Sequence, residues 1–275
     1  MSGLESLPDA PTVAQIVIAA TGESPDDLRI VDRGVTAVGW RVEAAGGPYC
    51  VLVALPRPEA GTEQAEIGPQ FEARAALLAA LGERDERCPT VIATSSLAGV
   101  PERLRRWPWM VTNWMRGEPL ADGSAMTAEL AREVGELLAH LHAIPVDGYG
   151  LLVDADGPLR GVSDDPGGAL TSRWGPDLWP FDGRPLAAHP LVQAAPELVL
   201  AVAGLREQLL AYAKAGAGAL CHTDLNPGHI WVEDGHLAGL IDFGDAAVLP
   251  PSIDIASFAY SYGWPAAEAL LEGYT

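Results

Sequence analysis

The sequence predicts an α+β fold in which a strand-rich part precedes a mainly helical part. Two observations support this order of elements. The first third of the chain holds apolar segments separated by turns that contain glycine and proline, which is typical of strands. The second half holds segments whose apolar residues recur with the helical period of 3.6 residues. The length of 275 residues suits one large domain or two small lobes.

The elements of the first third are a hairpin, a helix and a further strand. Residues 39–44 and 49–55 flank a Gly-Gly-Pro turn and are followed by Pro56, which predicts a β-hairpin. In the segment 70–81, Phe71, Ala75, Leu78 and Leu81 share one face of a helix, and Gly82 follows as a stop signal. The apolar segment 109–115 predicts a strand that leads into a turn.

The second half predicts two helices and a second hairpin. Thr127 begins a helix over 128–141, because its hydroxyl can cap the first turn. A second helix runs from Pro196 to Gly216, and we expect four of its apolar residues to face inward: Leu198, Val202, Leu205 and Leu209. Residues 151–190 are rich in Gly, Pro, Asp and Trp and predict an irregular loop. Asp234-Gly235 between apolar runs predicts a tight hairpin turn.

Composition excludes several classes of protein. The chain has 17 basic and 37 acidic residues and a net charge of −20, which argues against a nucleic-acid partner. Lys214 is its only lysine. The three cysteines lie far apart, a pattern typical of a reducing compartment. No apolar run reaches the roughly 20 residues that span a bilayer. We therefore expect a soluble cytoplasmic protein that does not bind membranes.

Two short motifs near the end of the chain carry the chemistry. Asp224 and Asp242 flank the second hairpin at a separation of 18 positions, so the hairpin must bring them close together. His229 follows Asp224 by five positions. Two carboxylates and an imidazole at one spot can hold a divalent cation and leave one carboxylate free as a base.

These motifs resemble those of the aminoglycoside phosphotransferase family. The matching residues are His222-x-Asp224-x-x-x-x-His229, then Ile241-Asp-Phe-Gly-Asp245, with Asp254 at the place of an aspartate that braces the catalytic loop. The resemblance implies a two-lobed, protein-kinase-like fold. It places a nucleotide-binding lobe at 1–111 and a catalytic and substrate lobe at 112–275.

The resemblance also implies roles for the catalytic residues. Asp224 would accept or orient the proton of the substrate hydroxyl, and Asp242 would hold Mg²⁺. His229 stands where the family usually has asparagine, and an imidazole is a poorer ligand for Mg²⁺ than an amide oxygen. Three roles stay open for it: weak coordination of the metal, preference for a softer ion, or a hydrogen bond to Asp224. We expect His222 to anchor the loop.

The nucleotide, ATP or GTP, is expected between the lobes, beside the strand Met110–Trp114 with its residues Thr112 and Trp114. Leu52 would face the base and Glu72 would stand on the helix as the usual glutamate partner of a phosphate-binding lysine. That lysine is missing, because Ala54 occupies its place. Either Arg41 or Arg57 replaces it, or the site has decayed.

We therefore expect a phosphotransferase that acts on a hydroxyl of a small cationic polyol, with an aminoglycoside-like antibiotic as the leading candidate and a macrolide as another. Its acidic cleft would attract a cation. Candidate lining residues are Asp164, Asp165, Asp177, Asp182, Asp245, Trp174 and Trp179. A catalytically silent small-molecule-binding protein is the alternative. A metal-dependent hydrolase that uses His222, Asp224, His229 and Asp242 ranks last, because it leaves the first lobe unexplained.

Overall fold

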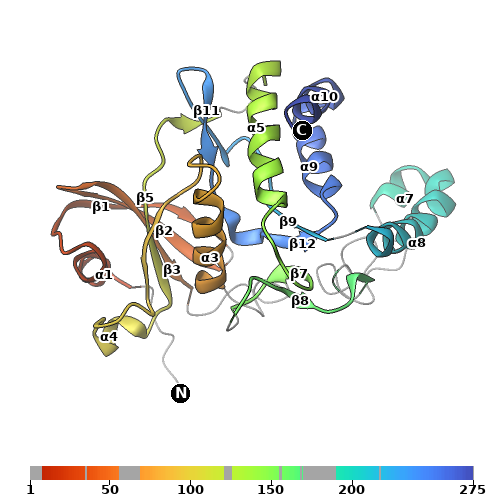
Figure 1. Cartoon of the computed structure of the whole chain (residues 1–275). Coiled ribbons are helices and arrows are strands. Elements are labelled where there is room, and N and C mark those ends of the chain that lie inside the picture. Colours follow the sequence, from red (N-terminus) through yellow and green to blue (C-terminus); the bar gives the residue numbers. More distant parts are fainter. Residues whose placement is uncertain are drawn as a thin grey trace.

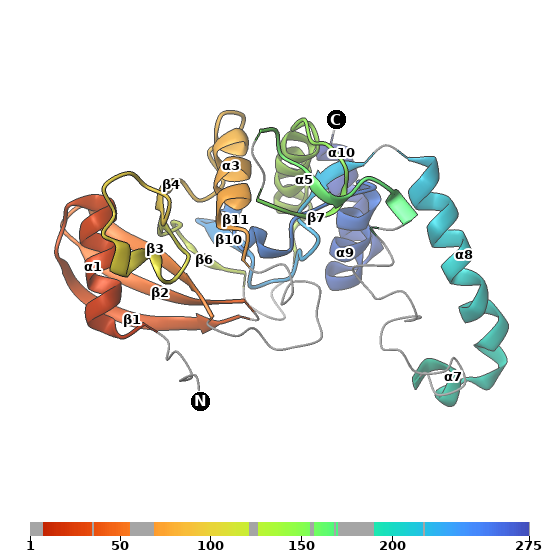
Figure 2. The same ribbon diagram turned by 90° about the horizontal axis from the view of Figure 1, so that it is seen from below.

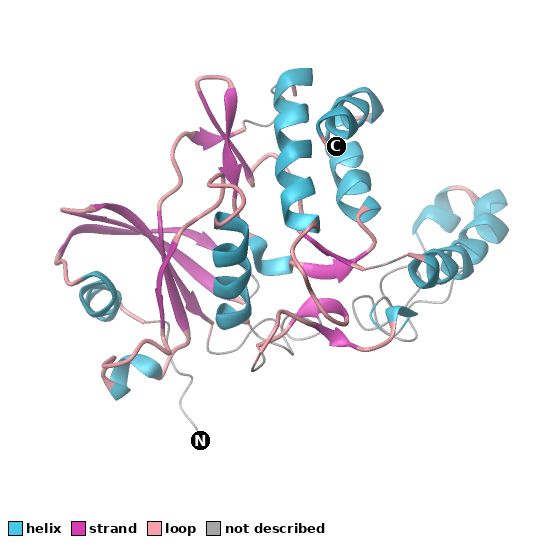
Figure 3. Cartoon of the chain, viewed as in Figure 1, coloured by secondary structure: helices cyan, strands magenta, loops and turns pink. Residues whose placement is uncertain are grey.

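The computed structural model describes residues 8–34, 36–55, 69–120, 126–154, 157–167, 169, 190–216 and 218–274. Strands dominate the first part of the chain and helices the second, which confirms the predicted α+β class (Figures 1 and 3). The two parts lie side by side, with helix α3 (Phe71–Gly82) between the first sheet and helix α5 (Ala128–His142).

The first part is built on a five-stranded antiparallel sheet. The strand order is β1-β2-β3-β5-β4. Its strands are β1 (Pro25–Arg33), β2 (Ala37–Ala44), β3 (Gly47–Ala54), β4 (Val91–Thr94) and β5 (Trp109–Asn113). Strands β2 and β3 pair without a bulge from Ala37 opposite Ala54 to Ala44 opposite Gly47, so the first predicted hairpin is confirmed.

Side chains alternate between the two faces of this sheet, because successive residues of a strand point in opposite directions. Val51 and Val53 of β3 are fully buried in a core that includes helix α1 (Ala10–Thr21). Leu52 and Ala54 belong to the opposite face, which packs with α3. Helix α1 and the one-turn helix α4 (Glu102–Arg105) have no counterpart among the sequence predictions, whereas α3 is confirmed.

The second part surrounds α5 with two small sheets and two further helices. Thr127 caps α5, since its Oγ1 accepts a hydrogen bond of 3.1 Å from the Leu130 amide, as the sequence predicts. The helices are α9 (Ser252–Tyr262) and α10 (Trp264–Gly273). One sheet joins β6 (Glu118–Pro119), β10 (Ile230–Glu233) and β11 (His236–Leu240), and the other joins β7 (Tyr149–Leu152), β8 (Gly161–Ser163), β9 (Ala219–Cys221) and β12 (Ala247–Leu249).

The second hairpin forms as the sequence predicts. Asp234 and Gly235 both have positive φ values, 53° and 87°, as a tight hairpin turn requires. Strands β10 and β11 pair from Ile230 opposite Leu240 to Glu233 opposite His236. The hairpin therefore sets the ends of the two catalytic motifs next to each other.

Two expectations about the second part are wrong in detail. The helix after Pro196 is present as a short 3₁₀ turn (Pro196–Leu198) followed by α8 (Val199–Ala215), but Leu198 and Leu205 are 38% and 43% exposed. Only Val202 of the predicted inward set is described as buried. Most of helix α8 lies away from α5 in both views, and α8 meets the start of α9 through a hydrogen bond between the hydroxyls of Tyr212 and Ser252 (Figure 2).

The segment predicted as an irregular loop also contains regular structure. Strands β7 and β8 occupy part of 151–190, and the short helix α7 (Pro190–Ala194) begins at its end. They escape the sequence prediction because each is only three to five residues long. Residues 170–189 lie outside the described part of the chain.

The chain passes from the first part to the second just after β5. The proposed lobe boundary between residues 111 and 112 falls inside this strand, which pairs with β3 from Trp109 to Asn113. The division into lobes at that residue stays a prediction. Within the described residues, every helix is too short or too polar to cross a membrane.

Candidate active site

A cleft between the first sheet and the second part holds two adjoining cavities of about 160 and 280 Å³. The smaller one is mainly apolar, with Leu78, Met110 and Trp231 on its walls. The larger one is polar and is lined by Asp224, Asn226, His229 and Asp245 among others. Both cavities share the residues Asp32, Gly39, Leu52, Arg74 and Asp242, which mark the junction.

The catalytic loop that carries Asp224 begins where β9 ends. The two residues before Asp224 are fixed by the fully buried Asp254, whose carboxylate accepts hydrogen bonds from the amides of His222 (2.8 Å) and Thr223 (2.6 Å). Thr223 has a φ of 71°, an uncommon conformation for a residue with a side chain. The buried carboxylate thus supports a strained backbone directly beside Asp224.

The His222 side chain anchors the loop from the other direction. Its Nε2 donates to the Ile241 carbonyl at 2.8 Å, because a carbonyl oxygen can only accept. Its Nδ1 is therefore the acceptor for the Asp224 amide at 3.2 Å. A neutral imidazole satisfies both contacts, and it ties the loop to the residue just before Asp242.

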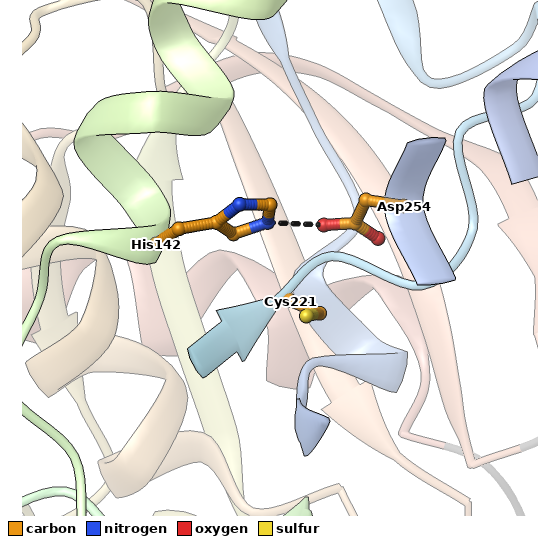
Figure 4. A group of neighbouring side chains, drawn as sticks. All are labelled: His142, Cys221 and Asp254. Carbon is orange, nitrogen blue, oxygen red and sulfur yellow. Dashed lines mark hydrogen bonds and ion pairs between the residues drawn. The ribbon is translucent and has the colours of Figure 1, made fainter. Parts of the chain in front are cut away.

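Asp254 is itself held by a chain of hydrogen bonds from α5 and the end of α10. His142 Nε2 lies 3.0 Å from an Asp254 oxygen, and His142 Nδ1 lies 2.6 Å from the Tyr274 hydroxyl (Figure 4). Cys221 lies beside this pair, with its thiol directed at main-chain carbonyls such as that of Leu249 (3.4 Å). The His, Cys and Asp side chains are close enough for a metal site. Their hydrogen bonds are instead those of a brace for the catalytic loop.

The imidazole of His229 lies between the two carboxylates. Its Nδ1 is 2.9 Å from the Asp224 carbonyl and 3.3 Å from Asp224 Oδ2, while its Nε2 is 3.5 Å from Asp242 Oδ2. Because the carbonyl can only accept, that contact requires a hydrogen on Nδ1, and Asn226 Nδ2, which lies 3.1 Å from the same nitrogen, then donates to Asp224 Oδ1 alone. In the neutral ring the Nε2 lone pair then faces Asp242.

Asp242 ends the second motif, immediately after β11 and before a 3₁₀ turn (Phe243–Asp245). Its φ is 57°, and its carboxylate accepts a hydrogen bond of 3.2 Å from the Gly244 amide. Burial acts to raise the pKa of Asp242, but the positive charge of Arg74 and the hydrogen bond from the Gly244 amide act in the opposite direction, and the pKa lies below its ordinary value. The carboxylate is therefore ionised and ready to bind a cation.

Three of the predicted nucleotide-binding residues line the apolar cavity. They are Leu52 of β3, Thr112 of β5 and Trp114. The amides of Asn113 and Trp114 donate to the carbonyls of Thr90 and Pro48, so these two main-chain donors are used within the fold. The binding roles of these residues stay predictions.

Glu72 and Arg41 lie off the walls of the two cavities. Glu72 is exposed on α3, and its Oε2 accepts a hydrogen bond of 3.0 Å from Thr94 of β4. The Arg41 guanidinium lies 4.7 Å from the ring centre of Trp114 and pairs with Glu43 at 2.7 Å. Both side chains are thus engaged with other residues of the protein, and their nucleotide-binding roles remain untested predictions.

Sequence reasoning missed two residues of the cleft, Arg74 and Asn226. Arg74 is only 6% exposed and lines both cavities. Its position was a signal, because it lies three residues after Phe71 and four before Leu78 on an otherwise apolar helix face. Asn226 donates from Nδ2 to Asp224 Oδ1 at 3.0 Å and accepts from the Gly228 amide at 2.8 Å.

The predicted substrate-binding residues are only partly placed. Asp245 lines the polar cavity, whereas Asp164 is 91% exposed and pairs with Arg160 at 2.8 Å. Asp165 follows it in the same turn, with its amide bonded to Ser163. The remaining substrate candidates lie outside the described residues: Trp174, Asp177, Trp179 and Asp182. So does Arg57, which the sequence offered as a replacement for the phosphate-binding lysine.

Comparison with known proteins identifies the family. A model of the phosphotransferase enzyme family matches residues 27–275. No curated protein matches the sequence. Among solved structures, the macrolide 2′-phosphotransferase of Brachybacterium faecium is similar, with a TM-score of 0.60 and 18% identity over 95% of this chain and 81% of the other.

Two further structures share the fold. A spectinomycin phosphotransferase in complex with ADP and spectinomycin has a TM-score of 0.61 and 13% identity, over 98% of this chain and 80% of the other. A fructosamine-3-kinase homologue from Thermobifida fusca has a TM-score of 0.58 and 21% identity, over 97% and 84% of the two chains. These likenesses confirm the kinase-like fold that the motifs imply.

Proposed function

The chain belongs to the phosphotransferase enzyme family, and on this premise we propose that it transfers the γ-phosphoryl group of ATP or GTP to a hydroxyl of a small molecule. One observation carries the proposal. Asp224, His229 and Asp242 converge on a polar cavity that opens directly into an apolar one. A nucleotide that places its base among apolar side chains would thereby present its phosphates to the carboxylates.

Asp224 would act on the substrate hydroxyl. Its side chain is 43% exposed toward the cavity, so a bound hydroxyl can reach it. Asn226 holds Oδ1, and the anchored backbone of His222 and Thr223 fixes the position of the residue. A carboxylate oriented in this way can accept the proton as the oxygen attacks phosphorus.

The donor set at the junction fits a divalent cation, and we propose Mg²⁺. Asp242 supplies an ionised carboxylate and His229 a nitrogen lone pair that faces it. The Nδ1–H of His229 is bonded to a main-chain carbonyl, the arrangement that usually orients a metal-binding histidine. The cation would neutralise the charge of the nucleotide phosphates.

The base of the nucleotide would occupy the apolar cavity, with Leu52, Thr112 and Trp114 around it. This assignment places the nucleotide between the proposed lobes 1–111 and 112–275. Arg41 and Glu72, the other two predicted nucleotide-binding residues, lie off the walls of the two cavities. A choice between ATP and GTP depends on polar contacts to the purine edge, so both donors belong in the test.

A cationic polyol is the proposed acceptor, with an aminoglycoside-like antibiotic as the leading candidate and a macrolide as the second. Four carboxylates line the polar cavity, those of Asp32, Asp224, Asp242 and Asp245. Their negative potential favours the approach of a cation. The structural neighbours include enzymes named for spectinomycin, hygromycin B and macrolides.

Thermal denaturation with nucleotide tests the binding step. We expect ADP, ATP or GTP at millimolar concentration with Mg²⁺ to raise the melting temperature, because a ligand that binds only the native state stabilises it. If none of them does so, the nucleotide site is wrongly assigned.

A transfer assay tests the chemistry. Each γ-labelled nucleotide is incubated with spectinomycin, hygromycin B, a macrolide and a fructosamine, and labelled product is separated by chromatography. Labelled product from at least one acceptor is expected. Nucleotide binding without transfer to any acceptor, in this panel extended to other polyols, would indicate the silent binding protein instead.

A further inference from the structure

The missing lysine of strand β3 leaves a question about the phosphates. Ala54, at its place, is 6% exposed and packs in the core with α3 residues such as Phe71. Arg41 stacks on Trp114 and pairs with Glu43, away from the cavity junction. Among the described residues, a phosphate-binding cation must therefore come from another element, and Arg57, the second candidate of the sequence, lies outside them.

We propose that Arg74 of helix α3 binds the nucleotide phosphates in place of the strand lysine. The proposal rests on the proposed function, since it concerns the same nucleotide site. Of the residues that the structure places on the walls of the two cavities, Arg74 alone is a lysine or arginine. It lines both cavities, so it lies where a nucleotide would pass from base to γ-phosphate.

The guanidinium of Arg74 has donors to spare. It is 94% buried, yet among the described residues the guanidinium makes one hydrogen bond, a long contact of 3.3 Å from Nη2 to the Pro69 carbonyl, and no ion pair; its carbon lies 5.4 Å from the ring centre of Phe71. A guanidinium has five N–H donors, and buried donors are nearly always satisfied. The fork of an arginine matches the oxygens of a phosphate.

Gly244 shows how close the guanidinium comes to the metal-binding residue. A Cβ atom at position 244 would lie 2.9 Å from both Arg74 Nη2 and Asp242 Oδ1, so these two atoms are separated by no more than twice that distance. A phosphate oxygen between them can bond to Arg74 while a cation on Asp242 holds the same phosphate chain. This is the pairing that a strand lysine and a metal aspartate provide in kinases.

Contacts at the start of α3 fix the helix that carries Arg74. Asp154, which follows β7, accepts a hydrogen bond of 2.7 Å from the Ala73 amide, and its own amide donates to the Gln70 side chain. On the other side, Glu72 is bonded to Thr94. The position of Arg74 is therefore set by both parts of the protein.

A purely electrostatic role is the competing explanation. Arg74 lies near Asp242 and Asp245, and it could serve only to offset their charge. The two roles differ in their dependence on ligand. If Arg74 binds phosphate, its removal weakens the binding of ADP more than the binding of adenosine. If Arg74 only compensates charge, its removal changes the affinities for adenosine and ADP equally, or changes only the affinity that depends on a bound metal.

Calorimetric titration of Arg74→Met with adenosine and ADP distinguishes these roles. We expect ADP affinity to fall about 10- to 100-fold, because a charge-assisted hydrogen bond is lost, while adenosine affinity changes less than about 2-fold. The loss should persist in EDTA. The matched control is Arg132→Met on α5, whose guanidinium pairs with Glu272 at the surface. Should GTP prove the donor, guanosine and GDP replace the adenine pair.

Several outcomes would overturn the proposal. An equal loss for both ligands, a loss seen only with Mg²⁺, or an unchanged ADP affinity each excludes phosphate binding by Arg74. A selective loss in Arg41→Met would assign the role to Arg41. If Arg74→Met does not fold, Arg74→Gln, which retains a polar group for Pro69, is measured with the same criteria. If the wild-type protein binds neither nucleotide, the proposed function itself fails.

Discussion

The two walls of the cleft are built differently. On the side of the second part, the catalytic loop is held by buried groups: Asp254 receives two main-chain amides and His142, and His222 bridges Asp224 to Ile241. On the side of the first sheet, the strand position of the usual lysine holds Ala54, and one guanidinium from α3 faces the junction. The proposed proton acceptor, Asp224, thus lies on a loop that buried hydrogen bonds hold in place. The proposed phosphate-binding cation, Arg74, comes from helix α3 and not from strand β3.

This difference shows where a site tolerates change. The catalytic carboxylate must be placed accurately against the reacting oxygen, and a small displacement is costly in rate. A cation that binds phosphate can approach from several directions, because the phosphate presents oxygens on all sides. We therefore expect substitutions that displace the braced loop to cost more activity than substitutions that move the phosphate-binding cation.

The largest effect is expected at the reacting carboxylate. Asp224→Asn removes the proton acceptor but keeps the shape, so kcat should fall about 10²- to 10⁴-fold. Nucleotide affinity should change less than about threefold, since Asp224 lies beyond the apolar cavity. Steady-state kinetics with the acceptor identified by the transfer assay, and calorimetry with ADP, measure the two quantities.

The matched control for Asp224→Asn is Asp27→Asn, on the exposed strand β1. Its kcat should equal that of the wild type. A kcat of Asp224→Asn within threefold of the wild-type value would contradict the role of Asp224 as the proton acceptor. The second part would then no longer be the side of the cleft that carries the catalytic group.

The second-largest effect is expected at Asp254, whose hydrogen bonds hold the catalytic loop. Asp254→Asn keeps one acceptor oxygen but turns an NH₂ group toward a buried amide or imidazole donor, which leaves that donor unsatisfied. A loss of about 2–3 kcal/mol in the free energy of unfolding is expected, together with a lower kcat and near-normal ADP affinity. Urea denaturation measures the stability.

Glu272→Gln is the control for this charge removal. Glu272 is 61% exposed and pairs with Arg132, so its loss should cost less than about 1 kcal/mol. Equal stability losses for Asp254→Asn and Glu272→Gln would show that Asp254 is not a brace.

The catalytic wall could be predicted from the sequence because its parts are local. His222, Asp224, His229 and Asp242 lie within one short stretch that a tight hairpin folds on itself. The pairing of β2 with β3 was readable for the same reason. Alternation of side chains along a strand then placed Leu52 on the cleft side.

The phosphate-binding cation could not be predicted in this way. Its place depends on how α3 packs between the first sheet and Asp242, which are distant in the sequence. The sequence offered Arg41 and Arg57 as replacements, but the aromatic ring of Trp114 and the carboxylate of Glu43 hold the Arg41 side chain, and Arg57 lies outside the described residues. Helix periodicity could have placed Arg74 on a buried face, but it does not say which charges that side chain meets.

The smallest expected effect concerns the hairpin that links the two motifs. Unlike the brace of the catalytic loop, its contact with α5 is exposed and titratable: His236 Nδ1 lies 2.8 Å from Glu133 Oε1. The hydrogen bond to Glu133 and its charge raise the pKa of His236 above the ordinary value. The protonated form is thus favoured in the native state. Its stabilisation is fully present below the unfolded-state pKa of about 6.5 and is lost as pH rises through the raised native pKa.

The difference in melting temperature between the wild type and His236→Gln should therefore be largest below about pH 6.5 and should shrink as the pH rises through the raised native pKa of His236. Added salt should reduce the low-pH difference, because an exposed ion pair is screened. Melting curves over this pH range at low salt and at about 1 M NaCl measure both effects. A difference independent of pH would mean that the hairpin is held by neutral contacts alone. Packing against α5 would then hold the hairpin that joins the two motifs, just as the buried hydrogen bonds of Asp254 hold the catalytic loop.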